Sequence, residues 1–174
     1  MSKSILAING STRAQSINHY LIKSIQELTK DQLEINIFNQ IDRIPHFNPD
    51  LDQGDPPKEV IAFRTQLKAA AGILICTPEY AMGIPGTLKN AIDWTVSSCE
   101  FYHKPTALIT ASSSGFKSHA ALLDVLNIIE ANITEKTQLL ISYVKMKVNE
   151  EGVKDLDTLN EIKALIRNFC ELLG

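Results

Sequence analysis

The segment from Asn9 to Asn18 carries the side chains of this chain that are best suited to bind an anion. It reads Asn9-Gly10-Ser11-Thr12-Arg13-Ala14-Gln15-Ser16-Ile17-Asn18. Its hydroxyls, an amide and one Arg could surround a terminal phosphate monoester with hydrogen bonds and one charge-assisted contact. The segment matches neither the glycine pattern of dinucleotide-binding loops nor the GK[ST] of P-loops, so those two classes of nucleotide site are not favoured.

FMN ends in a phosphate of this kind, but the segment alone leaves a simpler interpretation open. Ser16 could merely cap the following helix, and Ser11 and Thr12 could merely form a turn, as these residue types often do. Arg13 would then be an ordinary exposed side chain. A second segment is therefore needed to distinguish a phosphate site from a plain connection.

That second segment runs from Thr77 to Gly86 and is rich in residues that stiffen the backbone. Two prolines, two glycines and a tyrosine fall within Thr77-Pro78-Glu79-Tyr80-Ala81-Met82-Gly83-Ile84-Pro85-Gly86. Fixed backbone amides suit the polar edge of a flavin ring, and Tyr80 and Met82 could cover its apolar parts. The alternative is an ordinary strand-to-helix connection in which Pro85 starts the helix.

Alternating apolar runs and helical patterns predict the elements that position these two segments. We expect five strand-then-helix units: Ser4–Asn9 with Ile17–Thr29, Glu34–Phe38 with Lys58–Ala70, Gly72–Cys76 with Pro85–Ser97, Thr106–Thr110 with Phe116–Glu130, and Thr137–Val144 with Leu156–Leu173. Such alternation predicts an α/β fold, a parallel sheet with helices on both faces.

The character of the strands suggests their order in the sheet. Ile5 to Ile8 and Ile73 to Cys76 are continuously apolar, as in strands covered on both faces, whereas Leu33 to Ile37 alternates like an edge strand. The order 2-1-3-4-5 fits this pattern. In that order the first and third strands meet at a switch point, and ligands bind beyond the carboxyl ends of strands there. The two segments should therefore face one crevice.

The two segments together resemble the NADPH-dependent FMN reductase family, which includes quinone, azo-dye and chromate reductases of flavodoxin-like fold. The matching residues are Gly10-Ser11-Thr12-Arg13 with Ser16 and Asn18, then Pro78-Glu79-Tyr80 with Gly83, Pro85-Gly86 and Leu88-Lys89-Asn90-Ala91-Ile92-Asp93-Trp94. The resemblance spans roughly Ser4 to Gly115, while the remainder matches only in its alternation of elements.

The resemblance implies FMN as cofactor, NADPH or NADH as co-substrate, and a set of contact residues. Ser11, Arg13, Ser16 and Asn18 would hold the phosphate, and Ile17 would be a further cofactor contact. The ring would be flanked by Pro78, Glu79, Tyr80, Ala81, Met82 and Gly83. Ser112, Ser113, Ser114 and Gly115 follow the fourth strand, where the family contacts the ring and the ribityl chain. Many relatives carry Asn at the position of Ala81, so that side-chain contact is absent here.

In such enzymes the flavin carries the chemistry, so no catalytic residue and no metal site is expected. The four histidines, His19, His46, His103 and His119, lie at spacings that support no metal site. Glu79 could be read as a lone catalytic acid, but we favour a role in positioning the backbone. No CxxC pair occurs, so neither a zinc site nor a redox dithiol is suggested. We interpret Cys76, at the end of an apolar strand, and Cys170, on a helix, as core residues, and Cys99 as partly exposed.

Composition bounds the remaining possibilities. A chain of 174 residues with 44% hydrophobic and 21% charged residues predicts a single domain covering residues 1–174. A net charge of -3 favours neither a nucleic-acid partner nor a strongly acidic electron carrier. No stretch approaches the length of a membrane span, and no signal-peptide core follows Met1, so we expect a cytoplasmic protein.

Three alternatives to the reductase remain. A flavodoxin-type electron carrier would share the fold, a non-catalytic flavin-binding module is kept open by Ala81, and a nucleotide-binding enzyme of other chemistry would lack both of its phosphate signatures. The expected partners are a small electron acceptor and further copies of the chain, as a homodimer or homotetramer. Trp94, Ile84 and Phe101 are candidate interface anchors, with a core position as the alternative for Trp94.

Overall fold

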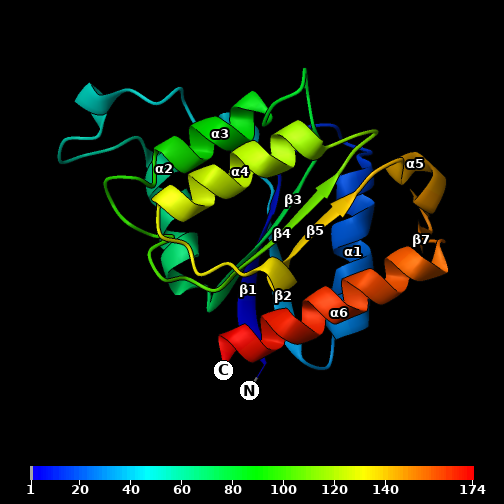
Figure 1. Ribbon diagram of the computed structural model, residues 1–174. Coiled ribbons are helices and arrows are strands. Elements are labelled where there is room, and N and C mark those ends of the chain that lie inside the picture. The colour runs from blue at the N-terminus through cyan, green and yellow to red at the C-terminus, as the bar shows by residue number, and fades with distance from the viewer. Residues whose placement is uncertain (1) are drawn as a thin grey trace.

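Five parallel strands form the central sheet of the computed structural model, which describes residues 2–174 (Figure 1). The strands are β1 (Lys3–Asn9), β2 (Leu33–Phe38), β3 (Gly72–Thr77), β4 (Thr106–Ala111) and β5 (Gln138–Ile141). They lie in the order β2-β1-β3-β4-β5, and each neighbouring pair is parallel. The predicted flavodoxin-like α/β fold and its strand order are therefore confirmed.

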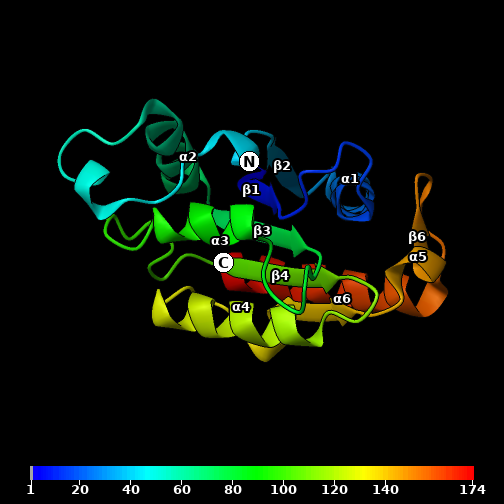
Figure 2. The same ribbon diagram turned by 90° about the horizontal axis from the view of Figure 1, so that it is seen from above.

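Helices cover both faces of the sheet and make a three-layer arrangement (Figures 1 and 2). Helices α1 (Ile17–Thr29) and α6 (Leu156–Leu173) pack on one face, whereas α2 (Lys58–Ala69), α3 (Gly86–Asp93) and α4 (Phe116–Ile128) pack on the other. Short 3-10 helices at Ile41–Arg43, Pro49–Leu51 and Glu135–Thr137 lie in the connections. Because all five strands are parallel, their carboxyl ends lie at the same edge of the sheet, and the loops after the neighbouring strands β1, β3 and β4 lie together.

The apolar patterns of the strands explain their positions. In β1, Ile5 and Ala7 pack under α1 and α6, while Leu6 and Ile8 pack under the helices of the opposite face. All residues of β3 and β4 are buried, as expected for strands covered on both sides. By contrast β2 alternates between buried and exposed residues and lies at the edge of the sheet.

The structure corrects the predicted end of the third helix, because α3 stops at Asp93 and not at Ser97. Trp94 O, which would continue the helical bonding, accepts a hydrogen bond from Arg64 Nε at 2.8 Å. The Thr95 hydroxyl also bonds back to Ile92 O at 2.7 Å. Hydroxyl side chains that bond to the local backbone in this way compete with a helix.

The segment after β5 also differs from the prediction, which extended the strand to Val144. The strand ends at Ile141, and a short helix α5 (Val144–Lys147) and a hairpin of β6 (Val148–Asn149) and β7 (Gly152–Val153) follow it. Figure 2 shows α5 and the hairpin at one end of the molecule, beside α1. Tyr143, which enters α5 with a φ of +54°, breaks the strand geometry at this point.

The prediction that Trp94 and Phe101 are interface anchors at the surface is wrong. Trp94 is 0% exposed and Phe101 is 1% exposed, so both belong to the core between the sheet and the helices α2, α3 and α4. The indole Nε1 of Trp94 donates to Pro45 O at 2.8 Å. Ile84 is half-buried against the same cluster.

The cysteines lie close to their expected environments. Cys76 is buried, Cys99 is exposed, and Cys170 is only half-buried at the margin of the core between α1 and α6. Burial raises the pKa of the Cys76 thiol far above its ordinary value, which keeps that thiol protonated. Among residues 2–174, no helix is both long and apolar enough to cross a membrane.

Candidate functional site

A close approach between β1 and β3 sets the start of the site. Gly10 N donates to Cys76 O at 2.8 Å just beyond the last residue of β1. A Cβ at Gly10 would overlap the side chain of Thr77, so only glycine allows the two chains to come this close. The loop after β1 therefore begins directly beside the loop after β3.

Asn9 organises the loop that follows. Its Oδ1 accepts a hydrogen bond from Ser11 N at 3.0 Å, and its Nδ2 donates to Ser16 Oγ at 3.2 Å. Ser16 Oγ also accepts from His19 N at 3.0 Å and so caps α1. The loop is thus held from inside by Asn9, a residue that was not among the predicted contact residues.

Unpaired polar groups gather at the amino end of α1. Within residues 2–174, the backbone N–H groups of Ser16, Ile17 and Asn18 have no acceptor, as is usual for the first turn of a helix. The Asn18 side chain is 4% exposed and donates from Nδ2 to Ala111 O at 3.3 Å. Its Oδ1 is buried without any hydrogen-bond partner in the described part of the chain. Buried polar atoms are nearly always paired, so Asn18 Oδ1 is available to accept a hydrogen bond from a bound ligand.

The loop after β3 ends in a tight turn from Tyr80 to Gly83. Tyr80 N donates to Gly83 O at 3.1 Å and Gly83 N donates to Tyr80 O at 2.9 Å. Between them Ala81 and Met82 have φ values of +47° and +60°, which is the geometry of a type I′ turn. The two side chains are held in a conformation that normally favours Asn and Gly, and Met82 is 70% exposed at the tip.

Glu79 joins this loop to the amino end of α4. Its carboxylate accepts hydrogen bonds from Ser118 N and Lys117 N, each at 2.9 Å, and from Gly115 N at 3.3 Å. The Ser118 N–H contributes most to holding the pKa of Glu79 below its ordinary value, although partial burial opposes the effect. Glu79 is therefore a charged cap of α4, in agreement with the positioning role that we expected.

The loop after β4 is tied to the start of α5. Ser112 O and Ser113 O accept hydrogen bonds from Val144 N and Tyr143 N, both at 3.1 Å, and Ser114 O accepts from Ser142 Oγ at 2.7 Å. The carbonyl groups of this loop thus point to α5. Across the described chain, no acceptor is found for the N–H groups of Ser113 and Ser114.

These loops surround one cleft of about 160 Å³ at the carboxyl edge of the sheet. Its lining includes, among the predicted residues, Ser11, Arg13, Ser16, Ile17, Asn18, Pro78, Glu79, Tyr80, Ser112 and Ser113. Ser11 and Tyr80 meet across it, with Ser11 Oγ and Tyr80 Oη 3.0 Å apart. The structure therefore brings residues of all three predicted loops together.

The remaining predicted residues stand beside the cleft and do not line it. Ala81, Met82 and Gly83 form a turn next to the lining residue Tyr80, and Ser114 and Gly115 complete the loop after β4 without lining the cleft. Three lining residues were not predicted: Ala111 at the end of β4, and Val144 and Lys145 of α5. A polar cleft of about 230 Å³ adjoins the other side of the β1 loop and shares Ser11 and Arg13 with the first.

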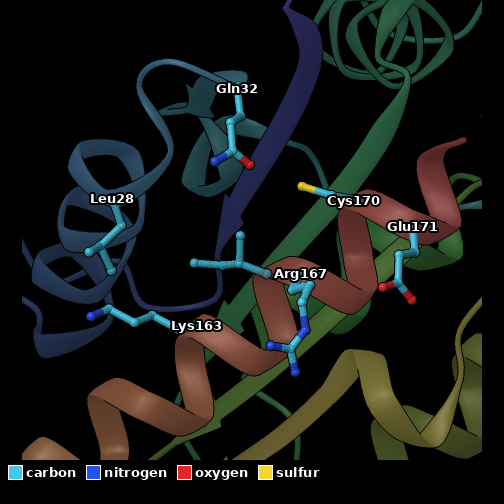
Figure 3. A pocket seen from close by; sticks show the side chains of 7 residues that line it. Leu28, Gln32, Lys163, Arg167, Cys170 and Glu171 are labelled. Carbon is cyan, nitrogen blue, oxygen red and sulfur yellow. The ribbon is translucent and has the colours of Figure 1, made fainter.

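A larger hollow lies elsewhere, between α1 and α6 (Figure 3). Its volume is about 640 Å³, and the residues around it are Leu28, Gln32, Lys163, Ile166, Arg167, Cys170 and Glu171. Leu28 lies in the last turn of α1 and Gln32 directly before β2, so this hollow is at the amino edge of the sheet. Because ligands of open α/β sheets bind at the carboxyl edge, we assign the site to the smaller cleft.

The donor set of the cleft fits a phosphate ester that also carries hydroxyl groups. Arg13 and the free N–H groups at the start of α1 can bind phosphate oxygens. Phosphate oxygens only accept hydrogen bonds, however, and cannot satisfy Asn18 Oδ1. The hydroxyls of a ribityl chain can donate to it, and FMN combines such a chain with a terminal phosphate.

Comparison with known proteins points to the same cofactor. The model of the NADPH-dependent FMN reductase family matches residues 4–145. The chain is 28% identical over 177 residues to a quinone reductase of Escherichia coli, covering 97% of this chain and 94% of that protein. It is 32% identical over 180 residues to an NADPH azoreductase of a Bacillus species, covering 97% and 95%.

Among solved structures, the flavoenzyme NAD(P)H:(acceptor) oxidoreductase FerB of Paracoccus denitrificans is similar with a TM-score of 0.87 and 27% identity. The alignment covers 98% of this chain and 97% of that one. An apo NADH:FMN oxidoreductase is similar in fold alone, with a TM-score of 0.69 and 19% identity. With the family model matching most of its length, this chain belongs to the NADPH-dependent FMN reductase family.

Proposed function

We propose that the protein is an NAD(P)H-dependent, FMN-containing oxidoreductase that reduces a small acceptor such as a quinone, an azo compound, a metal oxyanion or free flavin. The observation that carries the proposal is the buried Oδ1 of Asn18 beside the N–H groups at the start of α1, none of which has a hydrogen-bond partner among residues 2–174. When bound, FMN supplies the redox chemistry, since it accepts hydride from a nicotinamide and passes the electrons on. The chain itself supplies binding and orientation.

Each loop then has a distinct part in holding the cofactor. Ser11, Arg13, Ser16 and Ile17 bind the phosphate, and Asn18 accepts a hydrogen bond from the ribityl chain. The segment from Pro78 to Gly83 flanks the ring on one side. The segment from Ser112 to Gly115 lies on the other side, where the N–H groups of Ser113 and Ser114 are available as donors.

An open side of the cleft supports hydride transfer and disfavours simple electron carriage. Tyr80 is the aromatic residue that lines the cleft, and no aromatic residue occurs between Thr110 and Gly115. One face of a bound ring would therefore stay uncovered. A nicotinamide could approach it to the roughly 3 to 3.5 Å that a reaction between two atoms requires.

The colour of the purified protein and its response to reduced nicotinamides test this function. We expect yellow protein whose absorbance is bleached by NADPH or NADH in the absence of oxygen and restored by a quinone. A yellow protein that neither nucleotide bleaches would favour the electron carrier. A colourless protein that binds no added FMN would contradict the flavin site altogether. A steady-state survey of acceptors would then identify the preferred class.

We also propose that the protein forms a homo-oligomer, although not through Trp94 and Phe101. Three exposed apolar side chains, Val96, Tyr102 and Ile128, line one hollow between the segment after α3 and the end of α4. Such side chains on one surface are typical of a contact between subunits. Sedimentation that shows only monomer at micromolar concentration would contradict this proposal. A cytoplasmic location stays a prediction from the sequence.

A further inference from the structure

Part of the cleft lining comes from α5, which lies outside both sequence motifs. Val144 is 4% exposed and forms part of the floor, while Lys145 is exposed at the rim. Arg13 enters from the β1 loop and Lys145 from the segment after β5. The cleft is thus lined by two cationic side chains that come from separate segments of the chain.

The position of α5 is fixed by contacts on both of its flanks. At its start, Tyr143 N and Val144 N are bonded to the carbonyls of Ser113 and Ser112. At its end, Lys147 O accepts a hydrogen bond from Lys154 N at 2.8 Å. The hairpin that follows packs on α1 so closely that a Cβ at Gly152 would lie 2.8 Å from Ser24 Oγ. Lys145 is therefore presented to the cleft by a braced segment.

Without Lys145, the cleft has too little positive charge to neutralise a ligand with two negative charges. Glu79 is the acidic residue of the lining, but its carboxylate is engaged by the N–H groups of α4. A phosphate monoester carries a charge of about -1.5 to -2 at neutral pH. Arg13 alone neutralises only part of this charge. Lys145 has no carboxylate within 4.0 Å in the described chain, so its ammonium group is free to pair with a ligand.

We propose that Lys145 is the second cation that binds a phosphate monoester in this cleft, and that this monoester is the 5′-phosphate of FMN. The inference rests on the proposed function, because it requires the flavin site. The 2′-phosphate of NADPH has the same chemistry and is the other source from which such a group could come. The experiment therefore has to separate the two phosphates.

Titration of the apoprotein with FMN and with riboflavin tests the assignment without any measurement of activity. Charge-assisted contacts at exposed positions are weaker than buried ones, so we expect Lys145→Gln to weaken FMN binding about five- to tenfold. Riboflavin, which lacks the phosphate, should bind the variant as it binds the parent protein. The loss should shrink as salt is added, because an exposed ion pair is screened. Lys145→Arg should keep most of the affinity.

Lys147→Gln is the matched control, since Lys147 lies on the same short helix but does not line the cleft. We expect it to change FMN affinity less than twofold. Equal effects of the two variants on FMN, or an equal loss of riboflavin binding in Lys145→Gln, would overturn the proposal. So would a Lys145→Gln protein that binds FMN normally but has a raised KM for NADPH and not for NADH.

Failure of the inference can be told apart from failure of the proposed function. A parent apoprotein that binds neither FMN nor riboflavin would contradict the flavin site itself. A parent protein that binds FMN more tightly than riboflavin, with Lys145→Gln unchanged, would contradict only the part given to Lys145.

Discussion

The hydroxyl oxygens of Ser11 and Tyr80 lie 3.0 Å apart and join two loops that are 69 residues apart in sequence. Ser11 is buried, and Tyr80 is 45% exposed. The contact links the loop that we assign to the phosphate with the loop that we assign to the ring. The two walls of the cleft are therefore held in register by the protein alone, which lowers the ordering cost of binding a ligand.

A double-mutant cycle on apoprotein measures this link. We expect Ser11→Ala and Tyr80→Phe to be non-additive in the free energy of unfolding, with a coupling of about 0.5 to 1 kcal/mol, because they remove one shared hydrogen bond. Urea denaturation gives the four values. Tyr143→Phe is a suitable control, since Tyr143 is also exposed but does not line the cleft. Strict additivity of Ser11→Ala and Tyr80→Phe would show that the hydroxyls are not bonded in solution.

Arg13 should matter for FMN and not for riboflavin. A charge-assisted hydrogen bond contributes roughly 1.5 to 3 kcal/mol, so Arg13→Ala should weaken FMN binding by about one to two orders of magnitude. Quenching of flavin fluorescence during titration gives both affinities. Arg43→Ala, at an exposed position that does not line the cleft, should leave them unchanged. Unaltered FMN affinity in Arg13→Ala would remove Arg13 from the site.

Glu79 should make part of the stability dependent on pH. Its folded pKa is lowered, mainly by the Ser118 N–H, so the charged carboxylate stabilises the folded state above its ordinary pKa of 4.5. This contribution is lost as the pH falls through the lower pKa of the folded state. Glu79→Gln should therefore be less stable at pH 7, by about 1 kcal/mol for the loss of a charged helix cap, and should approach the parent protein in acid.

Urea denaturation across the range from pH 7 into acid tests this expectation. Glu161→Gln is the control, because Glu161 is exposed on α6 and caps no helix. Its difference from the parent should stay near zero throughout. A difference between Glu79→Gln and the parent that is the same at every pH would contradict the role of the Glu79 charge.

The sheet could be predicted because its strands differ in their apolar patterns. The continuous apolar residues of β1 and β3 require helices on both faces, and the alternation of β2 requires an edge position. From the resulting order, the meeting of the loops after β1 and β3 follows by topology. The grouping of Ser11, Arg13 and Tyr80 around one cleft was therefore accessible from the sequence.

The third wall of the cleft was not accessible, because tertiary contacts and not local patterns create it. Val144 falls within the strand that the sequence predicts, yet its N–H is bonded to Ser112 O, and the chain continues into α5. In the same way, Arg64 takes the carbonyl of Trp94 and ends α3 early. In both contacts the two residues are far apart in sequence, so no local periodicity predicts them.

The positive φ values of Ala81 and Met82 were also not predictable from the sequence. They lead to a prediction for Met82→Gly, in which stability should rise and FMN binding should fall. Both residues have positive φ values, and left-handed backbone costs an L-residue other than glycine roughly 1 kcal/mol. Ala81→Asn and Met82→Gly would supply the residues that a type I′ turn prefers. Each should stabilise the apoprotein by about 0.5 to 1 kcal/mol in urea denaturation.

Met82→Gly should also reduce function, because it removes the exposed side chain that we expect to cover the flavin or its acceptor. We expect weaker FMN binding or slower reduction of a quinone. Ala81→Asn would add the side chain that many relatives carry at this position, so it should bind FMN at least as tightly as the parent protein. Ala120→Gly in α4 is the matched control, because Ala120 is exposed in a helix and has no backbone strain to relieve; it should destabilise by about 1 kcal/mol. A Met82→Gly protein that is less stable than its parent would show that the turn is not strained. A Met82→Gly protein that is more stable, with unchanged FMN binding and turnover, would show that the Met82 side chain has no part in the site.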